Sequence, residues 1–131
     1  MLATDNLGRD KKSNQLSVSS EAEMAYDIKF AERVRAELQG LPFVEKKMFG
    51  GLGYLVHGNM VCGWYKGDMV VRIDPANHET FLKKKHAKPF ALRGKPMKGW
   101  LLVEPDGYKT AKQLSAWVKL GVEYALTLPP K

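Results

Sequence analysis

The chain has 131 residues, of which 44% are apolar, and a formal net charge of +7. This length and composition fit one globular domain with a single core. No window approaches the roughly 18 consecutive apolar residues of a membrane-spanning helix, and the N-terminal residues do not resemble a secretory signal. We therefore expect a cytoplasmic protein that does not associate with membranes.

The lone cysteine, Cys62, excludes an internal disulfide and a Cys-rich metal site. The positive charge is confined to one part of the chain: residues 1–23 carry three basic and four acidic side chains, net −1, whereas residues 24–131 carry eighteen and ten, net +8. A basic domain attracts phosphate backbones, anionic membrane surfaces or acidic proteins, and the net charge does not choose among them.

Residues 1–23 are rich in Ser, Asn, Asp and Lys and show no sustained apolar periodicity. Such a composition predicts a flexible N-terminal extension, followed by a folded domain over residues 24–131. A helical pattern begins abruptly after Met24. Translation starts at Met1 and at Met24 both fit the sequence.

The domain opens with an amphipathic helix. Asp27 is a favourable N-cap and Gly40 a favourable C-terminal stop, and the residues between them have apolar side chains at helical spacing. The predicted buried stripe consists of Ile28, Ala31, Val34, Leu38 and Leu41.

Three strands are expected next, over residues 47–56, 60–65 and 69–73, where β-type residues alternate. They are separated by His57-Gly58-Asn59 and Lys66-Gly67-Asp68, which suit the positive φ angles of tight hairpin turns. The pattern predicts an antiparallel meander.

Asp74-Pro75 predicts the start of a short helix that ends before Pro89. Two further strands follow, over residues 90–92 and 97–104, and then a helix over residues 110–127. The order α-β-β-β-α-β-β-α predicts an α+β fold, in which the two β units could share one sheet with the helices covering one face. The predicted buried stripe of the last helix is Leu114, Trp117, Val118, Gly121, Ala125 and Leu128.

Few residues suggest catalysis. Cys62 with His57 or His86 as base would make a thiol nucleophile, but Cys62 lies within a strand, where packing of a small apolar side chain is favoured. The histidines lack the spacing of metal ligands. We assign no catalytic residue, metal ligand or cofactor.

The glycines of Gly50-Gly51-Leu52-Gly53 lie within a β pattern that no helix follows, unlike the glycines of a phosphate-binding loop. A β-bulge, or close approach of a helix to the sheet, explains them better. The aromatic residues, together with Met48 and Met97, could line a binding face, but packing in the core is favoured. These aromatic residues are Phe49, Tyr54, Trp64, Tyr65, Trp100 and Trp117.

The strongest candidate binding feature is basic. Residues 83–98 hold seven cations and no acid, with Phe90 among them. Such a patch would neutralise phosphates, and an aromatic ring would stack on a base. The alternative is that the cations lie on a solvated helix end and hairpin and that Phe90 packs in the core. This alternative is favoured, because the sequence shows no element that recognises bases, such as a helix-turn-helix. Candidate contacts with nucleic acid or a partner are Lys46, Lys47, Lys83, Lys84, Lys85, Lys88, Arg93, Lys95 and Lys98.

Residues 24–131 resemble the N-terminal domain of the TfoX/Sxy family, bacterial regulators associated with competence. The resemblance is carried mainly by Lys46-Lys47-Met48-Phe49-Gly50-Gly51 and Pro96-Met97-Lys98-Gly99-Trp100. Further matches are Met24-Ala25-Tyr26-Asp27, Gly58-Asn59-Met60, Arg72 and the closing helix through Leu128-Pro129-Pro130. The resemblance implies a two-layer fold with a five-stranded antiparallel sheet and helices, similar to secretion-chaperone-like proteins. It also implies a role in transcription of DNA-uptake genes alongside an activator of the cyclic-AMP receptor type, and no enzymatic activity.

Full-length regulators of this kind carry a second, C-terminal helical domain, whereas this sequence stops at Lys131. We therefore expect a stand-alone, non-enzymatic regulatory or protein-interaction module, whose partner by resemblance belongs to the transcription machinery. The alternative is a protein that binds DNA directly through its basic patch. Homodimerisation through a strand edge or a Trp-bearing helix face stays open as well.

Overall fold

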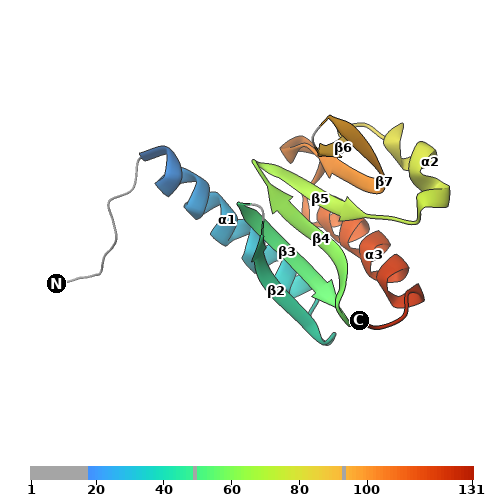
Figure 1. The fold of residues 1–131 in the computed structure, drawn as a ribbon. Coiled ribbons are helices and arrows are strands. Elements are labelled where there is room, and N and C mark those ends of the chain that lie inside the picture. The colour runs from blue at the N-terminus through green and yellow to red at the C-terminus, as the bar shows by residue number, and fades with distance from the viewer. Residues whose placement is uncertain (1–17, 49, 93) are drawn as a thin grey trace.

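The computed structural model of the protein describes residues 18–48, 50–92 and 94–131. Most of the predicted extension over residues 1–23 lies outside this range. The described residues form one antiparallel sheet in the order β2-β3-β4-β5-β7-β6, and α1 and α3 lie behind it in Figure 1. The helices are α1 (Val18–Glu37), α2 (His78–Leu82) and α3 (Ala111–Thr127), with 3-10 turns at Pro75–Asn77 and Pro105–Gly107. The strands are β2 (Phe43–Met48), β3 (Gly51–Val56), β4 (Asn59–Tyr65), β5 (Asp68–Arg72), β6 (Ala87–Leu92) and β7 (Lys95–Val103).

The predicted α+β class is confirmed, but the sheet has six strands instead of five. The predicted strand over residues 47–56 is a hairpin, because Gly50 adopts φ +76° and reverses the chain so that Met48 pairs with Gly51. Lys46 and Lys47 consequently belong to a separate edge strand, β2. The turn was hidden in the sequence because the residues on both sides of it are β-type.

Helix α1 begins at Val18, so the prediction that it begins at Asp27 is wrong. Its buried face is also rotated from the predicted one: Ile28 is 57% exposed, while Phe30 is buried edge-on against Tyr108, with ring centroids 5.6 Å apart. Val34 and Leu38 continue that face at helical spacing. The predicted stripe is therefore correct from Ala31 to Leu38, and Leu41, beyond the helix end, is half-buried against the core.

The sequence predicted the two tight turns at the correct triplets. In each triplet the first two residues form the turn. Positive φ angles occur at His57 and Gly58, between β3 and β4, and at Lys66 and Gly67, between β4 and β5. Two successive residues at positive φ match the twist of the strands they connect.

Helix α3 matches its prediction closely. Thr110 is its N-cap, and a capping box joins Thr110 and Gln113 in both directions. The predicted stripe is buried from Leu114 to Ala125, although Leu128 lies beyond the helix end and is half-buried. A Cβ on Gly121 would lie 2.2 Å from the carbonyl oxygen of Val61, so this glycine allows α3 to pack directly on β4.

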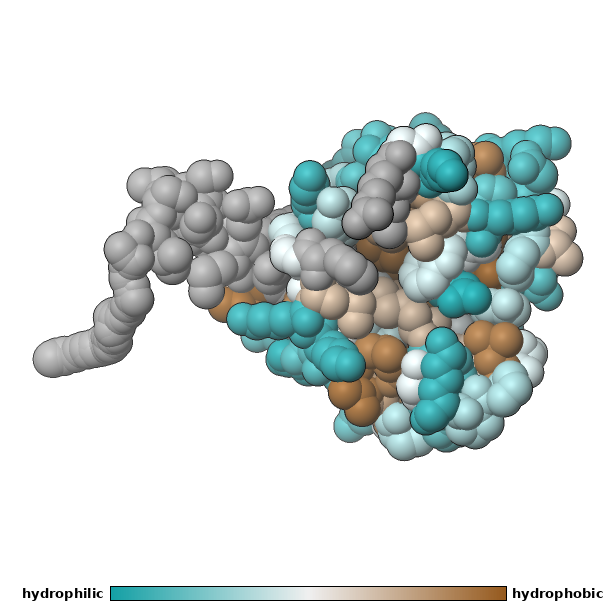
Figure 2. Space-filling view, viewed as in Figure 1, coloured by the Kyte–Doolittle hydropathy of each residue, from teal (hydrophilic) through white to brown (hydrophobic). Residues whose placement is uncertain are grey.

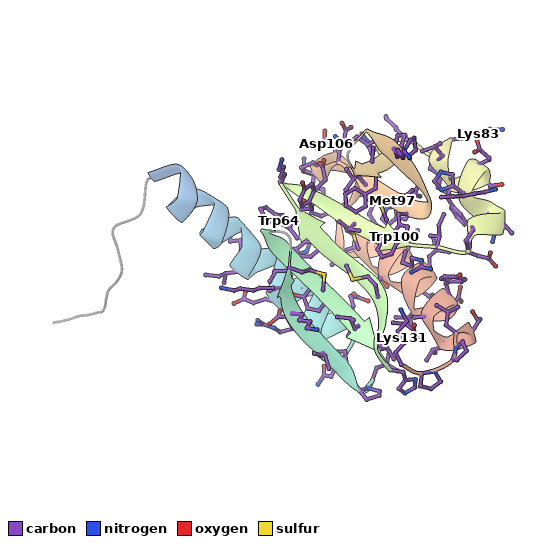
Figure 3. The ribbon with its side chains drawn as sticks, in the orientation of Figure 1. Trp64, Lys83, Met97, Trp100, Asp106 and Lys131 are labelled. Atoms are coloured by element: carbon purple, nitrogen blue, oxygen red, sulfur yellow. The ribbon has the colours of Figure 1, made fainter. Side chains whose placement is uncertain are left out.

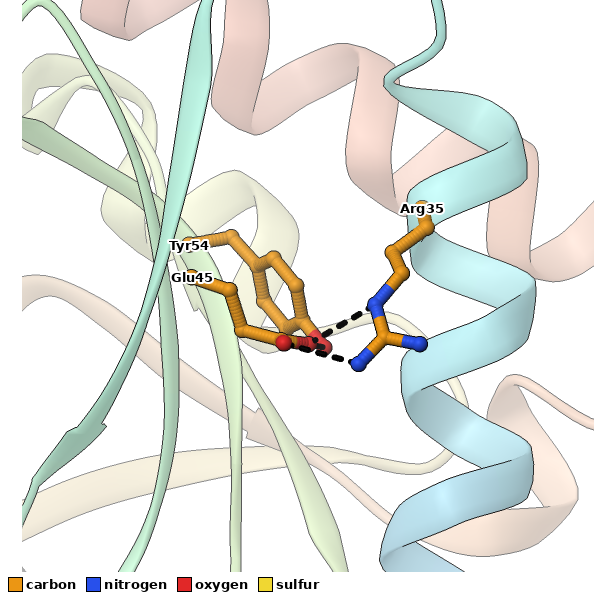
Figure 4. A network of polar contacts seen from close by, with 3 residues as sticks. All are labelled: Arg35, Glu45 and Tyr54. Carbon is orange, nitrogen blue, oxygen red and sulfur yellow. Dashed lines mark hydrogen bonds and ion pairs between the residues drawn. The ribbon is translucent and has the colours of Figure 1, made fainter.

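The core lies between the helices and the sheet, and a polar network closes it at the β2 side (Figure 4). Arg35 of α1 donates to both carboxylate oxygens of Glu45, at 2.7 and 3.2 Å, and the buried Tyr54 hydroxyl donates to Glu45 as well. Burial alone would raise the pKa of Glu45, but the hydrogen bonds from Arg35 and Tyr54 hold it below the usual value. Burial and the bond to Glu45 raise the pKa of Tyr54. The network fixes α1 to the edge of the sheet.

Candidate functional site

The sheet has one face covered by α1 and α3 and one that these helices leave uncovered, which we call the open face. Figure 2 shows the open face, where tan and brown residues form a band between teal ones. Alternate residues of each strand point to opposite faces. On β5, Val71 packs in the core, whereas Val70 faces the other way.

The open face contains a groove of about 230 Å³, which we call the sheet groove. Met97 and Trp100 of β7 project into it from the side of the sheet that faces the viewer in Figure 3. Phe90 joins the aromatic residues along it, with ring centroids 5.6 Å from Tyr65 and 6.4 Å from Trp100. The lining residues are Met48, Leu52, Met60, Trp64, Tyr65, Val70, Phe90, Met97 and Trp100. The groove is thus apolar, rich in aromatic rings and methionines, and draws on all six strands.

Glycines make room for the methionines. Gly53 and Gly63 are cross-strand partners on β3 and β4. A Cβ on Gly53 would lie 2.9 Å from the Sδ and Cε atoms of Met48 and 3.2 Å from Cε of Met60. A Cβ on Gly51 would lie 2.0 Å from the carbonyl oxygen of Trp64, a backbone atom of β4. These glycines therefore accommodate a neighbouring strand and the methionines. The prediction that a helix approaches the sheet closely at these glycines is wrong. The alternative prediction, a β-bulge, is correct, since the register shifts next to them, between Tyr54 and Leu55.

The sequence favoured core packing for the aromatic residues and methionines, and this is correct for only some of them. Tyr54, Trp64 and Trp117 are buried in the core, as predicted, and Trp64 also borders the sheet groove. Met48, Met97 and Trp100 instead line the sheet groove and are half-buried. The alternation of side chains locates a residue on one of two faces, but the sequence does not show which face the helices cover. Phe49 lies outside the described residues.

The candidate cations do not gather in one patch. Lys46 and Lys47 lie on the edge strand β2, whereas Lys95 and Lys98 lie on β7, four strand intervals or roughly 19 Å away. These four lysines are exposed. Because Met48 and Met97 line the sheet groove and residues two apart on a strand share a face, Lys46 and Lys95 flank the groove from opposite sides.

The remaining candidate cations are placed differently. Lys83, Lys84 and Lys85 follow α2 and are exposed, with Lys83 at the periphery of the molecule in Figure 3. Lys88 on β6 forms ion pairs with Asp68 at 3.0 Å and Glu104 at 3.7 Å. Arg93 lies outside the described residues. The run of cations at 83–98 therefore splits into a helix end, an internally paired lysine and a hairpin.

Cys62 is unsuited to catalysis as a nucleophile. Its side chain is completely buried in the core, and burial raises the pKa of the thiol to about 12. The histidine His78 is also buried, and its Nδ1 accepts a hydrogen bond from the Gly99 N–H at 3.0 Å. Within the part of the chain that the structure describes, no three His, Cys, Asp or Glu side chains cluster as a metal ion requires.

A second hollow, of about 460 Å³, lies between α3 and the chain after α2. Its polar groups serve the fold: Trp117 Nε1 donates to the Gly107 carbonyl and Gln113 Nε2 to the Asp106 carbonyl, both at 3.1 Å. The lining residues are Lys84, Lys85, His86, Gly107, Gln113, Ala116, Trp117 and Leu120. We regard the sheet groove as the better candidate, because its lining is apolar and its methionines are free to adapt.

Arg72, the last residue of β5, has a position that the sequence gave no reason to expect. Its Cζ atom lies 4.6 Å from the ring centroid of Trp100 and 5.2 Å from that of Tyr124. Trp100 is also its cross-strand partner and lines the sheet groove. The guanidinium thus contacts one ring that lines the groove and one ring on α3.

Among the described residues, no helix combines the length and apolar character needed to cross a membrane. The chain matches no curated protein. The family model described as TfoX N-terminal domain matches residues 37–125, which include β2 to β7 and all residues that line the sheet groove. Because this match spans well over half of the sequence, the chain belongs to the TfoX N-terminal domain family.

Proposed function

We propose that the protein is a cytoplasmic, non-enzymatic regulatory module that binds a short segment of a partner protein in the sheet groove. The observation that carries this proposal is an apolar groove on the face of the sheet that α1 and α3 leave uncovered. Apolar side chains exposed together on a protein surface are typical of interaction sites. The resemblance to competence regulators supports a partner in the transcription machinery.

The size and lining of the groove favour a peptide over a small molecule. Its volume of about 230 Å³ is below the roughly 300–1,000 Å³ that is usual for small-molecule sites, and suits one or two side chains. Met48, Met60 and Met97 have flexible, polarisable side chains that adapt to different apolar surfaces. Trp100 and Phe90 are of the residue types that anchor protein interfaces.

The distribution of cations gives less support to direct binding of nucleic acid. Phosphate neutralisation requires several cations along one path. Lys46 and Lys47 are instead separated from Lys83 to Lys85 by the width of the sheet, and Lys88 is paired with acids. DNA binding is therefore the alternative against which the proposal is tested.

A selection from a displayed library of random 12-residue peptides on the immobilised full chain tests the proposal. We expect apolar and aromatic residues to be enriched in the selected peptides. Fluorescence anisotropy would then compare variants: Met97→Ala shortens a groove residue, and Leu126→Ala shortens an exposed residue on α3. Loss of a central interface contact weakens binding by about fivefold to tenfold, so Met97→Ala should do this and Leu126→Ala should leave affinity unchanged.

Two results would contradict the proposal. One is that no peptide is enriched above the blank support. The other is that Leu126→Ala weakens binding as much as Met97→Ala, which would place the site on the helix side of the molecule.

A further inference from the structure

Arg72 lies next to the sheet groove, although it is not one of the residues that line it. Val70, two residues earlier on β5, lines the groove, and alternation directs Arg72 to the same face. Its partner across the strands, Trp100, lines the groove as well and stacks on the guanidinium at 4.6 Å. The cation therefore contacts a residue of the groove from outside the lining.

The hydrogen-bonding capacity of Arg72 is not used within the described part of the protein. Its Nε is buried and has no hydrogen-bond partner, and no acid among the described residues lies within 4.0 Å of its guanidinium. The other two arginines of residues 28–92 differ: Arg33 donates to the carbonyl oxygens of Tyr108, Lys109 and Thr110, and Arg35 pairs with Glu45. A buried polar atom without a partner is uncommon in proteins and calls for an explanation.

The two aromatic rings restrict what Arg72 can recognise. Contacts with Trp100 and Tyr124 hold the guanidinium and its Nε is buried, so a ligand would meet the edge formed by the two Nη atoms. Two parallel N–H donors at such an edge match the two oxygens of a carboxylate. One planar cation beside an apolar groove thus suits a single carboxylate next to apolar side chains.

The charge around the groove agrees with this chemistry. Lys46, Lys95 and Lys98 are exposed at its two sides, and the chain as a whole has a net charge of +7. Flexible lysines of this kind attract an acidic segment and speed its association, whereas a stacked arginine fixes its position.

We propose that Arg72 determines specificity in the sheet groove by binding the side-chain carboxylate of an Asp or Glu in the partner. The partner is a short protein segment that combines apolar residues with this acid. This inference rests on the proposed function, because it concerns the same groove, and it adds the chemistry by which the segment is selected.

The test uses the 12-residue random library on the full chain, selected in parallel on wild type and on Arg72→Gln. We expect wild type to enrich peptides with an Asp or Glu among apolar residues, and Arg72→Gln to enrich apolar peptides without that preference. The best acidic peptide and its matched amide analogue, Glu to Gln or Asp to Asn, are then compared by anisotropy. A charge-assisted pair should give wild type on the order of a tenfold preference for the acidic peptide, and Arg72→Gln should bind the two equally.

Further variants separate this role from general charge. Arg72→Lys keeps the charge but loses the planar edge, so the preference should fall to an intermediate value. Lys98→Gln removes an exposed charge near the groove and should keep most of the preference for the acidic peptide over its amide analogue.

An NMR measurement on the wild-type protein requires no substitution. The Nε–H resonance of Arg72 should shift when the acidic peptide binds and should stay in place when its amide analogue binds.

The outcomes distinguish the two proposals. Apolar peptides without an acidic preference on wild type, or a preference that persists in Arg72→Gln, would overturn the role of Arg72 and leave the groove as the binding site. Failure to enrich any peptide would overturn the proposed function itself. If Arg72→Gln does not fold, the Nε–H resonance and Arg72→Lys still decide.

Discussion

The two faces of the sheet are built from the same strands but for different purposes. On the covered face, Val61, Val71 and Leu101 are completely buried against the helices. On the open face, Met48, Met60 and Met97 are half-buried, and the first two pack over Gly53. Rigid branched side chains fill a sealed interior, whereas unbranched methionines can move to accommodate another surface. The comparison indicates that the covered face supplies stability and the open face is available for binding.

The largest expected effect is a difference in the free energy of unfolding between two variants on β7, one on each face of the sheet. Leu101→Ala removes a fully buried side chain and should lower the free energy of unfolding by about 2–5 kcal/mol. Met97→Ala, four residues earlier on β7 and half-buried, should cost about 1 kcal/mol or less while weakening peptide binding. Urea denaturation measures both. Equal costs for the two variants would contradict the division between the faces.

Glycines provide a second comparison. A methyl group on Gly121 would meet the backbone of β4, which cannot yield, so Gly121→Ala should cost about 1–3 kcal/mol by forcing α3 away from the sheet. At Gly53 the methyl group would meet only the flexible ends of Met48 and Met60. Gly53→Ala should therefore remain nearly as stable as wild type, yet bind the selected peptides less tightly because the methionines are displaced. Lys119→Ala, exposed on α3, is the control for stability and should change it by less than about 0.5 kcal/mol.

The sequence predicted most of the covered face. The spacing of the apolar residues from Leu114 to Ala125 identified α3 together with its buried stripe. The hairpin at Gly50 was missed because β-type residues continue on both sides of the turn. The start of α1 at Val18 was missed because the residues before Asp27 are polar and lack helical periodicity.

The candidate site could be predicted only in part. Both segments that contribute Met48, Met97 and Trp100 stood out in the sequence, but their role on the open face depends on which face the helices cover. Arg72 could not be singled out as a candidate from the sequence, because its aromatic neighbours Trp100 and Tyr124 are 28 and 52 residues away in the chain. Contacts of this kind follow from the tertiary fold, and no local pattern encodes them.

The polar network at the edge of the covered face predicts a dependence on pH. Glu45 has a pKa below its usual value of 4.5 in the folded protein, so its contribution to stability is present above about pH 4.5 and is lost as the pH falls through the lower, folded pKa. Glu45→Gln should lower the free energy of unfolding by about 1 kcal/mol at pH 7. The difference from wild type should shrink below pH 4.5, as urea titrations over a pH series would show. A difference that stays constant down to pH 3 would contradict this account of the network.

The smallest expected effect concerns DNA. Because the cations are dispersed, we expect weak binding to random duplex DNA with a shallow dependence on salt. The triple variant Lys84→Glu, Lys95→Glu and Lys98→Glu should accordingly change little in an anisotropy titration. Tight binding that falls steeply with salt and is abolished in this variant would support a direct nucleic-acid binder.

The most direct test of the open face as the binding site uses two tryptophans as reporters. Trp100 lines the sheet groove, and Trp117 lines the hollow beside α3, where its Nε1 donates to the Gly107 carbonyl. On titration of the wild-type protein with a selected peptide, the indole N–H resonance of Trp100 should shift and that of Trp117 should stay in place. A shift at Trp117 with none at Trp100 would contradict the central claim.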